Sequence, residues 1–222
     1  MAQAVLQFYF DYISPNAYLA WTQVPRLIAV HDVKVEPVPV LFAGLLDACG
    51  QRGPAEIPSK MRWMVRNILR KANRLQVPLN PPFSHPFNPL TALRVSSLPE
   101  LGDERTALIT AIFEAAWTRS RDVSDPATLV EVVNEVGLAG ESLVQRANAP
   151  KIKALLRENT ATAVRAGLFG VPALRVGEEL FWGLDDFPWF EAFLRGEDSL
   201  CREALESWSA VRLSASRRSP GK

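Results

Sequence analysis

The sequence contains only two cysteines, Cys49 and Cys201, and no Cys-x-x-Cys pair. A disulfide framework, a tetrahedral zinc site and dithiol redox chemistry all need more cysteines or a closer spacing, so all three are disfavoured. We expect both cysteines to pack as small apolar groups. The chain also has just two histidines, His31 and His85, without a metal-binding spacing, and we interpret His85 as a loop residue rather than a catalyst.

Net charge and long hydrophobic runs are lacking as well. The 222 residues include 25 Lys or Arg and 24 Asp or Glu, for a formal net charge of +1. No global field therefore argues for nucleic acid or an anionic membrane surface as a partner. No stretch approaches transmembrane length, and the opening MAQAVLQFYFDY lacks the pattern of a secretory signal. We expect a cytoplasmic protein with neither nucleic-acid nor membrane partners.

What the sequence does contain is a β-α-β start. Residues 4–10 (AVLQFYF) form a short aromatic run typical of a buried strand. Ser14 offers an N-cap hydroxyl and Pro15 fits the first position of a helix, which we expect to continue to about residue 30 with a kink at Pro25. Residues 33–40 (VKVEPVPV) alternate like a strand whose prolines suit a sheet edge.

The middle of the chain changes to helical spacing, with proline- and glycine-rich links between the segments. The predicted helices cover residues 41–49, 60–75, 89–97, 105–119, 126–136 and 151–166. Then FGVPALRV, GEELFWG and DDFPWFEAFL predict a strand, a tight turn, a second strand and a terminal helix. The polar, basic residues 212–222 are predicted to be a frayed tail.

A β-α-β start and a β-β-α finish, separated by helices, is the layout of a thioredoxin-type domain. We predict an α/β protein with a thioredoxin-like domain from residues 1–40 and 151–200 and an inserted all-helical domain from residues 41–150. In this fold the first strand-to-helix joint lies beside a loop ending in a cis-proline. Only about 5–6% of X–Pro bonds are cis, but the placement of Val171-Pro172 before a predicted hairpin favours that isomer.

Five segments occur in order along this layout: FYFDYISPNAYLA, PAEIPSK, PFNPLTALR, FGVPAL and FWGLDDF. Together they resemble the 2-hydroxychromene-2-carboxylate isomerases and kappa-class glutathione transferases, within the DsbA-like thioredoxin superfamily. The resemblance covers about residues 5–194. It implies a DsbA-like fold, glutathione as the cofactor, a homodimer, and a small aromatic or electrophilic substrate.

The resemblance also implies roles for individual residues. Ser14 would face the sulfur of glutathione, and Val171 before Pro172 would pair its backbone with the cysteinyl part. The residues matching the γ-glutamyl segment are Trp182, Gly183, Leu184 and Asp185. The residues matching positions near the substrate are Gln51, Lys60 and Asn88. The chain departs from the family's common pattern at three of these or adjacent positions, Gln51, Leu184 and Asp186.

A serine stands at the joint where thiol oxidoreductases carry Cys-Pro-x-Cys, and this suggests a borrowed thiol. A free thiol has a pKa of about 8.5, and a helix N-terminus favours its thiolate. A serine hydroxyl there can donate a charge-assisted hydrogen bond to the sulfur anion. We do not expect the hydroxyl to be the nucleophile, because no histidine base lies next to it in the sequence.

The leading hypothesis is a glutathione-dependent cis-trans isomerase of the 2-hydroxychromene-2-carboxylate type, acting in aromatic-compound catabolism. One alternative is a kappa-like glutathione transferase or peroxidase, which would use the same thiolate on an electrophile or hydroperoxide. A second, of another class, is a non-catalytic thioredoxin-fold binding protein, a reading to which Leu184 and Asp186 lend weight.

Overall fold

The computed structural model of the chain describes residues 3–212, 214 and 215. The strands are β1 (Ala4–Phe10), β2 (Val33–Pro39), β3 (Ala173–Val176) and β4 (Glu179–Trp182). The helices are α1 (Pro15–Trp21), α2 (Val24–His31), α3 (Phe42–Ala48), α4 (Pro58–Leu75), α5 (Leu90–Ser96), α6 (Glu104–Trp117), α7 (Pro126–Glu135), α8 (Gly140–Arg146), α9 (Pro150–Arg165), α10 (Phe187–Leu194) and α11 (Arg202–Ser209). Short 3₁₀ turns are η1 (Pro54–Glu56), η2 (Pro99–Leu101) and η3 (Leu184–Asp186). The predicted tail lies mostly outside the described residues.

The four strands form one mixed sheet in the order β2-β1-β3-β4. β1 runs parallel to β2, with Ala4 opposite Val33, and antiparallel to β3, with Phe8 opposite Leu174. β4 returns antiparallel to β3 through a tight turn at Gly177, whose φ of 61° suits a residue without a side chain. β2 is an edge strand, which explains why its prolines do not disrupt the ladder.

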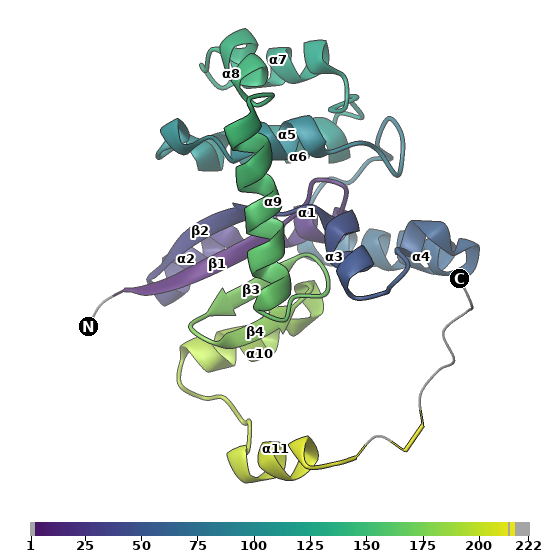
Figure 1. The fold of residues 1–222 in the computed structure, drawn as a ribbon, viewed down its shortest axis with the longest axis vertical. Helices are drawn as coiled ribbons and strands as arrows, with labels where there is room; N and C mark the ends of the chain where they lie inside the picture. The colour runs from purple at the N-terminus through teal and green to yellow at the C-terminus, as the bar shows by residue number, and fades with distance from the viewer. Residues whose placement is uncertain (1–2, 213, 216–222) are drawn as a thin grey trace.

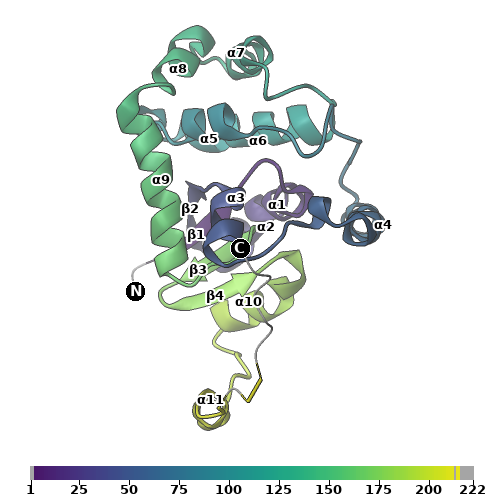
Figure 2. The same ribbon diagram turned by 45° about the vertical axis from the view of Figure 1, so that its right-hand side comes forward.

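Helices cover both faces of the sheet (Figures 1 and 2). Side chains alternate along β1, so Leu6, Phe8 and Phe10 join the larger buried cluster, which also contains residues of α1, α2 and α10. Tyr9 points the other way, into a second cluster that contains residues of α3 and α9. The β1 strand is therefore buried on both sides, which fixes the position of the loop that follows it.

Helices α5 to α8 extend this core away from the sheet. α5 and α6 lie next to the sheet, and α7 and α8 lie beyond them (Figure 2). Tyr12, in the loop after β1, is fully buried and meets the ring of Phe113 edge-on at 4.7 Å. Its hydroxyl lies 2.5 Å from Ser96 Oγ on α5, and its carbonyl accepts a hydrogen bond from Trp117 Nε1 at 2.9 Å. The loop after β1 is thus anchored in the helical layer.

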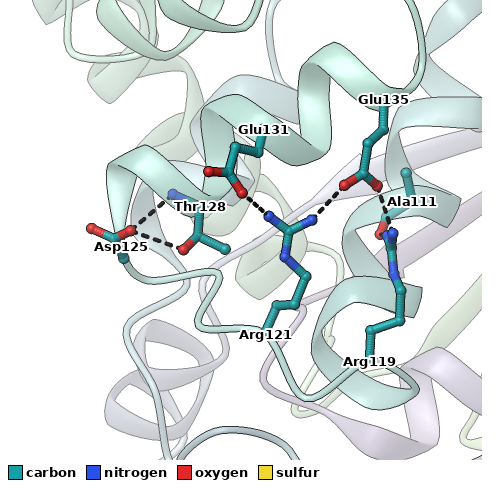
Figure 3. Close-up of polar contacts among 7 residues, drawn as sticks. All are labelled: Ala111, Arg119, Arg121, Asp125, Thr128, Glu131 and Glu135. Carbon is teal, nitrogen blue, oxygen red and sulfur yellow. Dashed lines mark hydrogen bonds and ion pairs between the residues drawn. The ribbon is translucent and has the colours of Figure 1, made fainter.

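The connection from α6 to α7 is held by charges at the surface (Figure 3). Arg121 pairs with both Glu131 and Glu135 on α7, and Arg119 also pairs with Glu135. Asp125 caps α7 by accepting a hydrogen bond from the backbone N–H three residues later at 2.8 Å. Because both glutamates are solvent-exposed, we expect these pairs to orient α7 more than to stabilise the protein.

Two expectations from the sequence are wrong. The helix expected to reach residue 30 is broken after α1 and resumes as α2, because Pro25 lies in the first turn of a new helix, where a missing N–H costs little. Cys49 and Cys201 are exposed rather than packed, since Cys49 ends α3 and Cys201 precedes α11.

α11 lies apart from the other helices in both views, and its residues are all exposed (Figures 1 and 2). Within the described part of the chain, no helix combines the length and apolarity needed to cross a membrane.

Candidate functional site

The joint between β1 and α1 presents the hydroxyl of Ser14. Ser14 has an extended backbone and caps α1, because its Oγ accepts a hydrogen bond from Ala17 N–H at 3.2 Å. Pro15 occupies the first helical position, as the sequence predicts. Ser14 is 9% exposed, so its hydroxyl lies at the boundary between the core and the solvent.

The loop before β3 lies against this serine. The Val171–Pro172 bond is cis, which confirms the prediction. Ser14 Oγ is 3.4 Å from the Val171 carbonyl, a long distance for an O–H···O hydrogen bond, so the hydroxyl is only weakly held there. The Pro172 carbonyl accepts from Gly183 N–H at 2.9 Å, which brings the end of β4 to the same place.

A charged cluster from three elements lies beside Ser14. Lys71 of α4 places its Nζ 3.1 Å from Asn16 Oδ1 on α1 and 2.7 Å from Asp185 Oδ2 in η3. The Lys71 side chain is 15% exposed, whereas that of Asp185 is 75% exposed. The sequence does not reveal the role of Lys71, since a lysine on an amphipathic helix has the same local pattern whether it is solvated or paired.

A buried acid, Asp11, makes hydrogen bonds that hold the loop carrying Ser14. Asp11 is fully buried, and its two carboxyl oxygens accept hydrogen bonds from Ile13 N–H at 3.1 Å and Phe42 N–H at 2.9 Å. Its carbonyl accepts from Ser14 N–H at 3.1 Å. Burial raises the pKa of Asp11 to about 7, against the two backbone hydrogen bonds, which lower it. The available sequence signal was an acid directly after the aromatic strand.

His85 holds the same loop from the side of the helical layer. Its Nε2 lies 3.1 Å from the Ile13 carbonyl, and because a carbonyl only accepts, Nε2 carries the proton. Burial lowers the pKa of His85, although its hydrogen bond to Ile13 opposes that effect. His85 lies between α4 and α5 outside any helix or strand, which confirms its interpretation as a loop residue.

Residues 5–195 match the DSBA-like thioredoxin domain, which is most of the chain. The chain belongs to this family. The match confirms the predicted DsbA-like thioredoxin fold.

Relatives of this DsbA-like protein include two kinds of enzyme. The 2-hydroxychromene-2-carboxylate isomerase of Sphingobium xenophagum is 28% identical over 191 residues, covering 85% of this chain and 97% of that protein. Glutathione S-transferase kappa 1 of Caenorhabditis elegans is 27% identical over 196 residues, covering 82% of this chain and 87% of that protein. The solved structure of a 2-hydroxychromene-2-carboxylate isomerase has a TM-score of 0.80 and 20% identity, covering 91% of this chain and 98% of that chain. This structural likeness shows the shared fold.

The other residues predicted for glutathione lie at the end of β4. Trp182 is 50% exposed, and its ring packs against Phe169 with centroids 5.1 Å apart. Gly170 permits this arrangement, because a Cβ there would lie 2.6 Å from Trp182 Nε1. Gly183 has a φ of 79°, and Leu184 packs partly against the larger core cluster.

Among the described residues, the three residues predicted for the substrate make no hydrogen bond or ion pair with Ser14. Lys60 is exposed in the first turn of α4, and Gln51 is exposed just beyond α3. Asn88 is exposed, and its Oδ1 accepts from Leu90 N–H at 3.1 Å at the start of α5. None of the residues predicted to bind glutathione or substrate lines the cavity of about 600 Å³ between α3, α5 and α9. The candidate site is therefore the set of segments that meet at Ser14.

Proposed function

We propose that this DsbA-like protein is a glutathione-dependent cis-trans isomerase of the 2-hydroxychromene-2-carboxylate type, acting in aromatic-compound catabolism. The observation that carries the proposal is the position of Ser14, a weakly held hydroxyl at a helix cap beside the cis-Pro172 loop. The isomerase relative, which this chain covers almost completely, supports the choice of reaction. We further propose a cytoplasmic homodimer in which a thioredoxin-like domain is interrupted by a helical domain.

The residues around Ser14 fit glutathione chemically. The Ser14 hydroxyl gives up only a long contact of 3.4 Å when it turns toward a ligand sulfur. Val171 offers backbone groups to the cysteinyl part, and the γ-glutamyl end would lie along the segment from Trp182 to Asp185. Lys60, Asn88 and Gln51 would be nearer the substrate.

The role of Ser14 in this proposal is to hold the sulfur as its anion. A charge-assisted O–H···S⁻ hydrogen bond favours the charged form and so lowers the thiol pKa from about 8.5. Glutathione held by Ser14, Val171 and the segment from Trp182 to Asp185 would supply a thiolate nucleophile for reversible addition to an unsaturated carbon of the substrate, which is the chemistry that a cis-trans isomerisation needs. In this proposal the protein orients the two reactants, and the isomerisation needs neither net oxidation nor hydrolysis.

Calorimetric titration with glutathione tests the proposal, combined with the ultraviolet absorbance of the thiolate near neutral pH. We expect wild type to bind glutathione as the thiolate and Ser14→Ala to lose the thiolate absorbance. Loss of the cap alone would lower stability by about 0.5–2 kcal/mol. Asp125→Ala is the matched control, because it removes the cap of α7 away from the site and should leave the absorbance unchanged. Absence of glutathione binding in wild type would overturn the proposal.

A kappa-like glutathione transferase or peroxidase is the second candidate, favoured by the similarity to glutathione S-transferase kappa 1. It would use the same thiolate on an electrophile or a hydroperoxide. Interconversion of isomers at constant glutathione concentration supports the isomerase, whereas stoichiometric consumption of glutathione supports the transferase or peroxidase. A non-catalytic binding protein, the third hypothesis, predicts no glutathione affinity.

A further inference from the structure

The ion pair between Lys71 and Asp185 is not explained by a need for folding stability. Three quarters of the Asp185 side chain is exposed, and an ion pair in such a place contributes little to folding. The lysine is nevertheless enclosed and held at two points, by Asn16 on α1 and by Asp185 in η3. Lys71 of α4 is therefore held by polar contacts to both α1 and η3.

Both partners of Lys71 are tied to the Ser14 site. Asn16 follows Ser14 by two residues within the first turn of α1. Asp185 follows Gly183 by two residues, and Gly183 N–H donates to the Pro172 carbonyl at 2.9 Å. A peptide whose sulfur lies at Ser14 can therefore extend toward this ion pair along the end of β4.

The pair also has unused hydrogen-bonding capacity. An ammonium group has three N–H donors, and Lys71 uses two, toward Asn16 and Asp185. Asp185 uses Oδ2 for Lys71, and its Oδ1 has no hydrogen-bond partner among the described residues. The mostly buried Lys71 therefore has one further donor, and the exposed Asp185 has one further acceptor, beside their shared ion pair.

We propose that Lys71 joins Asp185, which lies in the segment already proposed to hold the γ-glutamyl group, to form a receptor for the zwitterionic end of glutathione. The γ-glutamyl group carries a carboxylate and an ammonium on one carbon atom. Lys71 takes the carboxylate and Asp185 takes the ammonium, so that two ion pairs lie head to tail and each charge has opposite neighbours. This inference rests on the proposed function and adds to it a specificity-determining residue, Lys71.

The receptor requires both ligand charges, and shortened peptides test this without altering the protein. Glutathione is compared by calorimetry with glutaryl-Cys-Gly, which lacks the ammonium, and with 4-aminobutyryl-Cys-Gly, which lacks the carboxylate. We expect each shortened peptide to bind wild type about 10- to 100-fold more weakly than glutathione, the range of a hydrogen bond to a charged group. Equal affinity for all three peptides would overturn the inference.

Variants then assign each charge to a residue. Lys71→Met should bind glutathione about 10- to 100-fold more weakly than wild type and should no longer distinguish glutathione from the peptide without a carboxylate. Asp185→Asn should likewise no longer distinguish glutathione from glutaryl-Cys-Gly, the peptide without an ammonium. Arg74→Met removes an exposed cation from the same helix and is the matched control, expected to behave as wild type.

The outcomes separate this inference from the proposed function. If Lys71→Met binds all three peptides as wild type does, the inference fails, while the proposed function stands on the Ser14-dependent thiolate absorbance. If Lys71→Met weakens all three peptides equally, the lysine acts on the fold and not on the carboxylate, and the inference fails again. If wild type does not bind glutathione, the proposed function fails first and the inference with it.

Discussion

The buried carboxyl of Asp11 predicts that the protein becomes less stable as the pH rises through 7. Burial raises the pKa of Asp11 in the folded protein to about 7, whereas an aspartate in an unfolded chain has a pKa of about 3.9. The folded state therefore keeps a proton that the unfolded state releases. The stability from this group is fully present below about pH 3.9 and is lost as the pH rises through the folded pKa, opposite to a carboxylate in an ion pair.

The expected magnitude follows from the two pKa values. Their full difference corresponds to about 4 kcal/mol, since each pKa unit is worth about 1.4 kcal/mol. Between pH 6 and pH 8 the loss of unfolding free energy from Asp11 is about 1.4 kcal/mol, a tenfold change in the equilibrium constant. His85 acts in the opposite direction, because burial lowers its pKa and its contribution is lost as the pH falls below about 6.5.

Urea unfolding of wild type and Asp11→Asn at both pH values, followed by tryptophan fluorescence, isolates the Asp11 effect because His85 is common to both proteins. The asparagine keeps one acceptor but faces the second N–H with its own NH₂ group, so we expect a loss of about 1–3 kcal/mol at pH 6. That loss should shrink by about 1.4 kcal/mol at pH 8, because only wild type ionises. The same difference at both pH values would refute the reasoning.

Two further substitutions test the packing around the site and at the surface. Tyr12→Phe should lower the free energy of unfolding in urea by about 1 kcal/mol, since it removes the buried hydrogen bond to Ser96, and a loss that varies between pH 6 and pH 8 would contradict this assignment. Arg121→Ala should cost no more than about 1 kcal/mol, because its partners Glu131 and Glu135 are exposed, and the cost should fall in high salt; a loss that salt does not reduce would mean that packing, not charge, holds α7.

Local patterns determined much of the architecture. The order of the strands and of most helices followed from apolar spacing, although α8 and α11 were not predicted. The cap at Ser14 followed from a hydroxyl and a proline at the start of a helical pattern, because both signals act within a few residues. The cis bond at Pro172 followed from the position of a proline before the hairpin of a recognisable layout. The exact end of α1 did not follow, since a proline signals a helix boundary more reliably than it signals which helix it belongs to.

Only the tertiary structure decided which polar residues meet at the site. Lys71 is 55 residues from Asn16 and 114 from Asp185, so no local pattern links them. The exposure of Cys49 and the desolvation of Asp11 likewise depend on what other segments pack over them, and not on their neighbours in the sequence. The sequence determined most of the elements and the serine at the joint, whereas the charges around that serine were set by packing between segments distant along the chain.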